Sequence, residues 1–277
     1  MRPEYKSNIK TTLDNYRHWW NDKHLARPLL QIYAPRKGVI SDHSYNEWVT
    51  LAHNLDNPDK AFEEFEKYCQ QTYFGGEAIP RFWVNLGPGV IATYLGCELK
   101  IKKETIWIEE RGDLSWDEIL NLQFDQNDKW WQLTKKLTRK AGRYSSGKYF
   151  TSITDLNGTL NILASLRGTQ NLSTDLIKNP KVVKKACEKI LDIWFQCYDE
   201  LYQICSRYQP GSITWMGVWF PGRGSDLQSD FSAMISPDMF QEFVIPDIKK
   251  QSRYLDQTIY HLDGPGQLVH VKHLLEI

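Results

Sequence analysis

The stretch SPDMFQEFVIPDIKKQSRYLDQTIYHLDGPG, residues 236–266, decides the fold. It predicts a helix that begins with Ser236 as N-cap and Pro237 at the first helical position, and that Pro246 kinks or breaks midway. A strand follows over TIYHLDGPG, residues 258–266, and ends in a turn rich in glycine and proline. This order, a helix followed by a short apolar strand with polar residues at its end, is typical of α/β proteins.

The same pattern recurs along the chain. Short β-rich runs end in Pro, Gly, Asn or Asp, and each of the earlier ones is followed by a stretch with helical spacing; they are RPLLQIYAP (27–35), IPRFWVNLGPG (79–89), YFTSITDLNG (149–158), SITWMGVWFPG (212–222) and the strand at 258–266. Helices are expected from Pro58 over NPDKAFEEFEKYCQQTYF and from Pro180 over the long run that ends near residue 208, because Asn-Pro marks a helix start. ETIWIEE (104–110) resembles half of a hairpin. Apolar runs that alternate with helices indicate buried parallel strands.

Composition excludes several classes of function. The 277 residues carry 34 basic and 34 acidic side chains, so the formal net charge is zero and nucleic acid is not an expected partner. A run of about 18 apolar residues, which a membrane helix needs, is missing from the sequence. The N-terminus is polar, unlike a secretory signal. The five cysteines are an odd number without a Cys-x-x-Cys pair, which is typical of reduced thiols. We therefore expect a cytoplasmic protein that has no contact with a membrane.

Polar residues at the ends of different strands favour a (β/α)8 TIM barrel over an open doubly wound sheet. Such residues are Arg36, Asn85, Asp155, Arg223 and His261, and a barrel active site draws its groups from many strand ends on one face. Neither a Gly-x-Gly-x-x-Gly motif nor a Walker loop supports a nucleotide-binding fold. We expect one domain over residues 1–277, with an N-terminal helical segment at about 1–26. Five strands do not close a barrel, so the remaining strands are expected beyond Ile277; a partial, open barrel is the alternative.

Three segments resemble the uroporphyrinogen decarboxylase superfamily. They are FGGEAIPRFWVNLGPGVIATYLGCE, TDLNGTLNILASLRGTQNLSTDLIKNPKVVKKACEKI, and the stretch from SDFSAMISPDMF to IYHLDGPG. The most specific feature is Ile-Ser-Pro-x-x-Phe-x-x-Phe-x-x-Pro before a strand that ends in His-x-(Cys/Asp)-Gly. This family also includes zinc methyltransferases that move methyl groups between corrinoid proteins and thiols. The resemblance implies a barrel with its pocket at the C-terminal face, and it makes a homodimer plausible.

The resemblance favours the methyltransferase branch over the decarboxylase branch. The decarboxylase binds substrate carboxylates through paired arginines after the first strand, where this chain has only Arg36. Its catalytic aspartate corresponds to Asn85, and an amide cannot supply the negative charge that stabilises the cationic transition state.

In the methyltransferases, a His-x-Cys pair and a later cysteine hold zinc. His261 matches this histidine, and Asp263 stands in place of the first cysteine. Zinc accepts a carboxylate beside imidazole, and residues i and i+2 of a strand point to the same side. His261 and Asp263 are therefore candidate ligands of zinc or another divalent metal. The alternative is a structural histidine with Asp263 as the cap of the next helix.

The remaining candidates line the same predicted pocket. Asp155 is a catalytic candidate, although an Asx turn would explain it equally well. Trp83, Trp215 and Trp219 are expected to form an apolar wall, with core packing as the alternative. Arg223, between two glycines, could bind an anionic group or be an exposed loop residue.

We therefore predict a methyltransferase that transfers a methyl group to or from a corrinoid, either free or carried by a partner protein. The predicted catalytic residues are His261, Asp263 and Asp155. The predicted substrate-binding residues are Arg36, Asn85, the three tryptophans and Arg223. The substrate would be a small methyl donor or acceptor. The alternatives are a decarboxylase acting on a carboxylated tetrapyrrole, and a binding barrel without catalytic activity.

Overall fold

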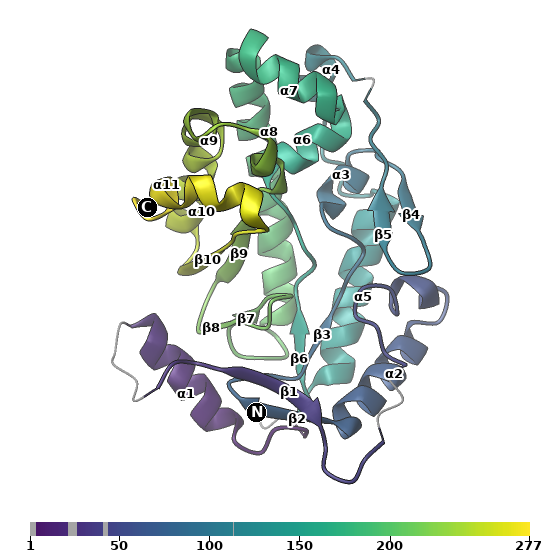
Figure 1. Ribbon diagram of the computed structural model, residues 1–277. Helices are drawn as coiled ribbons and strands as arrows, with labels where there is room; N and C mark the ends of the chain where they lie inside the picture. The colour runs from purple at the N-terminus through teal and green to yellow at the C-terminus, as the bar shows by residue number, and fades with distance from the viewer. Residues whose placement is uncertain (1–3, 22–26, 41–43, 113) are drawn as a thin grey trace.

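The computed structural model shows a mixed α/β fold (Figure 1) and describes residues 4–21, 27–40, 44–112 and 114–277. The strands in this part of the chain are β1 (Gln31–Pro35), β2 (Thr72–Gly76), β3 (Arg81–Trp83), β4 (Leu99–Ile101), β5 (Ile106–Ile108), β6 (Phe150–Ser152), β7 (Ser212–Ile213), β8 (Trp219–Phe220), β9 (Gly224–Gln228) and β10 (Gln257–His261). The helices are α1 (Ile9–Trp20), α2 (Pro58–Gln71), α3 (Val90–Tyr94), α4 (Trp116–Asn121), α5 (Lys129–Ser145), α6 (Thr159–Arg167), α7 (Thr169–Lys178), α8 (Pro180–Cys205), α9 (Pro237–Phe243), α10 (Ile245–Tyr254) and α11 (Val271–Leu274), with short 3-10 turns at Ala52–Asn54, Asp230–Met234 and Pro265–His270.

The strands pair two by two. β3 runs parallel to β6, and β10 runs parallel to β9, whereas β1–β2, β4–β5 and β7–β8 are antiparallel. β7 contacts both β6 and β9, so it lies between the two parallel pairs (Figure 1). In the described residues these pairs do not close into a barrel, and the expected TIM barrel is therefore not confirmed.

The first predicted strand differs most from expectation. Residues 31–35 form a strand, but its partner is the antiparallel β2, in a segment that we expected to continue the helix from Pro58. α2 ends at Gln71, because Thr72–Gly76 combines β-branched and aromatic residues with Gly75 and Gly76, which disfavour helix. Gly76 has a φ of 57°, and a Cβ there would lie 2.2 Å from the Leu30 carbonyl oxygen. Only glycine permits this crossing.

A buried carboxylate lies at the end of the antiparallel β1–β2 pair. Glu77 accepts hydrogen bonds from the Arg27 guanidinium at 2.7 and 2.9 Å, from Asn15 at 2.9 Å and from the Leu30 N–H at 2.9 Å. Burial alone would raise the pKa of Glu77, but these hydrogen bonds lower it to about 2. Glu77 therefore binds the N-terminal segment to the start of the sheet.

The run at 212–222 is a hairpin instead of a single strand. Gly217, with a φ of 76°, makes a turn in which its N–H donates to the Thr214 carbonyl at 2.9 Å, and the chain returns antiparallel as β8. The partner of β10 is β9, whose sequence GSDLQ contains a single large apolar residue. Such a polar strand gives no hydrophobic run, and the sequence did not indicate it.

Most predicted helix starts are confirmed. Pro58 and Pro180 lie in the first turns of α2 and α8, and the Ser236 hydroxyl accepts a hydrogen bond from the Met239 N–H at the start of α9. The helix breaks at Val244, directly before Ile245-Pro246 begins α10. The run at 104–110 pairs as one strand of the β4–β5 hairpin, as expected.

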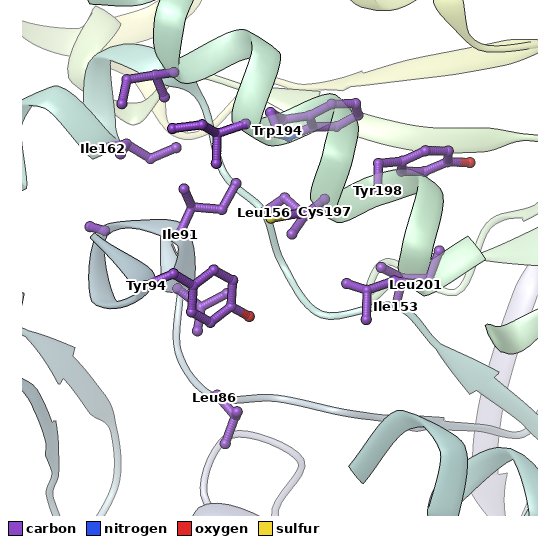
Figure 2. Close-up of a cluster of buried hydrophobic side chains, with 14 of the residues drawn as sticks. Leu86, Ile91, Tyr94, Ile153, Leu156, Ile162, Trp194, Cys197, Tyr198 and Leu201 are labelled. Carbon is purple, nitrogen blue, oxygen red and sulfur yellow. The ribbon is translucent and has the colours of Figure 1, made fainter. Parts of the chain in front are cut away.

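The main core lies between α8 and the segments that follow β3 and β6. Figure 2 shows Trp194, Cys197, Tyr198 and Leu201 of α8 in one cluster with Ile91 and Tyr94 of α3 and with Ile153 and Leu156 after β6; the ring of Tyr198 points away from α3. A second, smaller cluster joins α1 to Ile79, Phe150, Ile213 and Trp219. All five cysteines are buried. None of the described helices combines the length and apolarity that crossing a bilayer requires.

Candidate functional site

Polar side chains from several strand ends meet in one cluster. Asp155 follows β6, and the side chain of Gln228, the last residue of β9, donates to its two carboxylate oxygens at 2.8 and 3.0 Å. The Asn157 N–H donates to the same carboxylate at 2.8 Å, which closes the Asx turn considered above. Asp155 and Gln228 are each 7% exposed. The carboxylate is therefore held in place from two strands and largely shielded from water.

Trp215 connects the other members of the cluster. Its indole N–H donates to Asp226 of β9 at 2.6 Å, and its ring lies edge-to-face against His261, with the centroids 4.9 Å apart. Trp83, the last residue of β3, stacks on the same ring at 5.8 Å. We call Asp155, Asp226, Gln228, Trp215 and His261 the strand-end cluster.

Two carboxylates of this cluster have raised pKa values. Burial is the main cause for Asp155, and the charges of Asp226 and Asp230 add to it, so that its pKa reaches about 7 against an ordinary value of 3.8. The pKa of Asp226 is also raised, mainly by burial, while the Trp215 N–H and the nearby His261 oppose this shift. With a pKa of about 7, Asp155 can give up or accept a proton near neutral pH.

The turn after Asp155 has an unusual backbone. Asn157 has a φ of 58°, the one positive value for a non-glycine residue in the described ranges. A Cβ on Gly158 would lie 2.1 Å from the Gln228 carbonyl oxygen, so the turn and the end of β9 touch directly. Asn157 lines a cavity of about 320 Å³ together with Asn161 and Asp230. Asn161 donates to Asp230 at 2.7 Å.

A larger cavity, of about 590 Å³, lies on the other side of Trp215. We call it the aromatic cavity, because most of its lining is aromatic: Tyr33, Tyr45, Trp48, Phe65, Tyr68, Phe74 and Trp215, with Gln31, Asn46, Glu47, Ile79, Arg81 and Met216. Arg81 forms an ion pair with Glu47 at 2.9 Å and donates to the Trp215 carbonyl. The cavity therefore contains one positive and one negative side chain, already paired.

Asn85, predicted to contact substrate, instead supports this cavity. Its side chain is 2% exposed and donates to the backbone carbonyls of Glu47 and Trp48 at 3.4 and 3.1 Å. Its oxygen accepts from the Gly87 N–H at 2.8 Å. These bonds hold the segment that carries Trp48, whose ring lies 5.2 Å from Trp83 and 6.3 Å from Trp215.

Other predicted residues lie away from the cluster. Trp219 is fully buried in the small core against α1, and its N–H donates to the Pro210 carbonyl at 2.8 Å. Arg223 forms an ion pair with Asp199 of α8 and lies over the ring of Tyr254, 4.8 Å from its centroid. The contacts of Trp219 match the core alternative. Arg223 is ion-paired and only partly exposed, so it matches neither the exposed-loop alternative nor the lining of the two cavities.

Arg36 and Asp263 are the remaining predicted residues. Arg36 donates to the Thr72 and Tyr5 carbonyls at 3.0 and 3.4 Å, which ties the end of β1 to the N-terminal segment. Asp263 is exposed, and its charge raises the pKa of Asp230, for which burial is the larger cause. Gly264, not Asp263, stands at the N-cap of the following 3-10 turn.

The described residues hold no group of three or more His, Cys, Asp and Glu side chains that could bind a metal ion. A catalytic zinc takes three protein ligands, so His261 and Asp263 would need a further donor from outside this part of the chain. The pair stays a prediction, and the described donors do not by themselves fit zinc.

Sequence reasoning missed Asp226, Gln228, Glu47 and Trp48. Asp226 and Gln228 have the same i, i+2 spacing at a strand end as His261 and Asp263, and that spacing was the available signal. Glu47 and Trp48 lie in a loop far from any predicted strand, and only the tertiary structure brings them to Arg81.

Comparisons with known proteins give a likeness of fold. A methyltransferase from Methanosarcina mazei has a similar structure, with a TM-score of 0.57 and 13% sequence identity over 92% of this chain and 70% of that chain. No family model matches the sequence, and no curated protein matches it. At this identity the likeness shows the fold alone.

Proposed function

We propose that the protein is a methyltransferase in which the buried carboxyl pair of the strand-end cluster protonates the leaving group of a methyl donor. The observation that carries the proposal is Asp155, whose pKa of about 7 suits a general acid at neutral pH. The fold likeness to a methyltransferase supports the reaction class. In this proposal β3, β6, β7, β9 and β10 are an arc of a (β/α)8 barrel, whose catalytic groups lie at the carboxyl ends of its strands.

The proposed step is a displacement at the methyl carbon. A nucleophilic acceptor, either a thiolate or the reduced cobalt of a corrinoid, forms a bond to this carbon while the bond from carbon to the donor heteroatom breaks. The heteroatom retains the bonding electron pair and receives the proton of Asp155. Asp155 is left as a carboxylate, which accepts hydrogen bonds from Gln228 and Asn157 and regains a proton from solvent after product release.

The methyl acceptor is proposed to come from a partner. The two cavities, of about 590 and 320 Å³, have the size of sites for small ligands. A corrinoid would then be carried by another protein and approach the strand ends from outside. His261, beside Trp215, would orient the bound donor.

The test is methyl transfer to free cob(I)alamin from a panel of methyl ethers, thioethers and methylamines, followed by the absorbance change on cobalt methylation. Because Asp155 acts as an acid, the rate should fall as the pH rises through about 7. Asp155→Asn should lower kcat by about 10²–10⁴-fold, with intact folding by circular dichroism. The exposed Asp192→Asn on α8 is the control and should match wild type.

Gln228 offers a sharper readout. Its hydrogen bonds lower the pKa of Asp155, so in Gln228→Met the rate of methyl transfer should fall at a higher pH than in wild type. If this fall occurs at the same pH in Gln228→Met and is also seen in Asp155→Asn, another group supplies the proton. Absence of transfer from every donor of the panel would contradict the proposed function.

A further inference from the structure

We infer that the aromatic cavity binds a flat aromatic ligand that presents an oxygen acceptor to Arg81. The inference concerns the cavity on the β1 side of Trp215, and apart from Trp215 it depends on side chains outside the strand-end cluster.

The walls of the cavity suit an aromatic ring. Trp48 and Trp215 form one side, with ring planes inclined by 56°, and Tyr45 packs against Tyr68 and Phe65 at centroid distances of 5.4 and 5.1 Å on another. Trp48 is 47% exposed although its backbone is held by Asn85. Aromatic side chains around a volume of about 590 Å³, Trp48 the most accessible of those just named, offer stacking and edge-to-face contacts to a planar ligand.

Arg81 indicates which polar group the ligand carries. Two of its nitrogens are engaged by Glu47 and the Trp215 carbonyl, whereas its buried Nε has no hydrogen-bond partner among the described residues. A guanidinium can donate but cannot accept, so a ligand has to bring an acceptor. Arg81 lines the cavity with 12% of its side chain exposed, so the remaining N–H groups of its guanidinium can donate to an ether, phenol or carboxylate oxygen.

The charges argue against a cationic ligand. Aromatic cavities also bind quaternary ammonium groups, but here the carboxylate of Glu47 is neutralised by Arg81 at 2.9 Å. A cation would meet a guanidinium whose side chain is only 12% exposed. The balance therefore favours a neutral or anionic oxygen ligand.

Trp215 links this cavity to the proposed chemistry. It lines the cavity, and its indole N–H donates to Asp226 at 2.6 Å. The lining of the cavity holds the carboxylate of Glu47 but neither Asp155 nor Asp226. The cavity therefore adjoins the strand-end cluster without containing its acid.

Isothermal titration calorimetry with three probes tests the inference without any turnover. 4-Methoxybenzoate and the neutral 4-methoxybenzyl alcohol should both bind, because each offers a ring and an oxygen acceptor. Cyclohexanecarboxylate, which lacks the aromatic ring, should bind at least about tenfold more weakly. Benzyltrimethylammonium, with the ring but a cationic group, should not bind measurably.

Variants assign the binding to the cavity. Trp48→Ala should weaken binding of 4-methoxybenzoate about tenfold, whereas Trp19→Ala, a similarly exposed tryptophan on α1, should leave it unchanged. Glu47→Gln removes the negative charge beside Arg81 and should tighten 4-methoxybenzoate severalfold, with little effect on the neutral alcohol. Glu47→Gln keeps the shape of the side chain, so the test survives if Trp48→Ala fails to fold.

The outcomes separate this inference from the proposed function. Equal binding of the cyclohexane and aromatic acids, or tighter binding of the cation, would overturn it, as would binding that neither Trp48→Ala nor Glu47→Gln alters. Methyl transfer from donors without a ring, combined with no binding of the aromatic probes, would leave the proposed function standing and this inference refuted.

Discussion

Replacing Asp155 with asparagine should make the protein more stable at alkaline pH. The native state binds a proton at Asp155 that the unfolded chain releases, because the pKa is about 7 in the folded protein and 3.8 ordinarily. The stability that this raised pKa contributes is complete below about pH 3.8, and it is lost as the pH rises to about 7. Asparagine keeps the shape of the protonated side chain but has no charge to desolvate.

The magnitude follows from the shift. About three pH units correspond to roughly 4 kcal/mol of unfolding free energy, at about 1.4 kcal/mol per unit. With an unfolding entropy of roughly 2.1 cal/mol/K per residue, a chain of 277 residues converts this to a Tm difference of about 7 °C. Asp155→Asn should therefore unfold several degrees above wild type at pH 8 and close to it at pH 4.

Differential scanning fluorimetry from pH 4 to 8 measures this difference directly. Asp192→Asn, which replaces an exposed carboxylate on α8, should differ from wild type by the same small Tm difference at every pH. If Asp155→Asn lowers the Tm at pH 8, or if its difference from wild type does not change with pH, then Asp155 is not a desolvated carboxyl group and its proposed role as an acid fails with it.

Three further changes should have distinct effects. Gly158→Ala places a Cβ 2.1 Å from the carbonyl at the end of β9, and it should lower the unfolding free energy by about 2–4 kcal/mol in urea titrations. Gly266→Ala is the control, because its Cβ would approach an alanine side chain at 3.3 Å and should lower the unfolding free energy by less than about 1 kcal/mol. Equal losses in the two variants would contradict the close approach of Gly158 to β9. Wild type should lose Tm between about pH 4.5 and pH 2, because the lowered pKa of Glu77, about 2, gives a stabilisation that disappears as the pH falls. Glu77→Gln should show a smaller fall of Tm over this range. An equal fall in the variant would show that other groups cause it. The metal content of wild type, His261→Ala and Asp263→Ala should be equal by mass spectrometry, since two donors are fewer than a catalytic zinc takes; stoichiometric zinc lost in both variants would confirm the pair as ligands.

Local sequence signals predicted the helices well. An Asn-Pro or Ser-Pro start acts within one turn, through the cap and the fixed φ of proline, so α2, α8 and α9 begin where expected. Strand partners depend on residues far apart in the chain. The segments at 72–76 and 224–228 carry short or polar sequences, and they became strands because β1 and β10 pair with them.

In the candidate site, too, local sequence signals predicted some positions correctly, while others depend on the tertiary fold. Asp155, Trp83, Trp215 and His261 meet because each follows or ends a strand whose position the apolar runs indicated. Trp219 was assigned to the pocket on the assumption that 212–222 is one strand, in which alternate residues share a face. The turn at Gly217 ends that alternation and carries Trp219 to the opposite core.

The turn after β6 joins the core to the proposed chemistry. Leu156 packs into the main core against α8 (Figure 2), while its neighbours Asp155 and Asn157 face the strand-end cluster. Burial of Leu156 holds Asp155 away from bulk water, and the contact of Gly158 with β9 brings it to Gln228. The desolvation that raises the pKa of Asp155 thus arises from the same packing that stabilises the fold, which explains how an ordinary aspartate acquires the pKa that the proposed reaction needs.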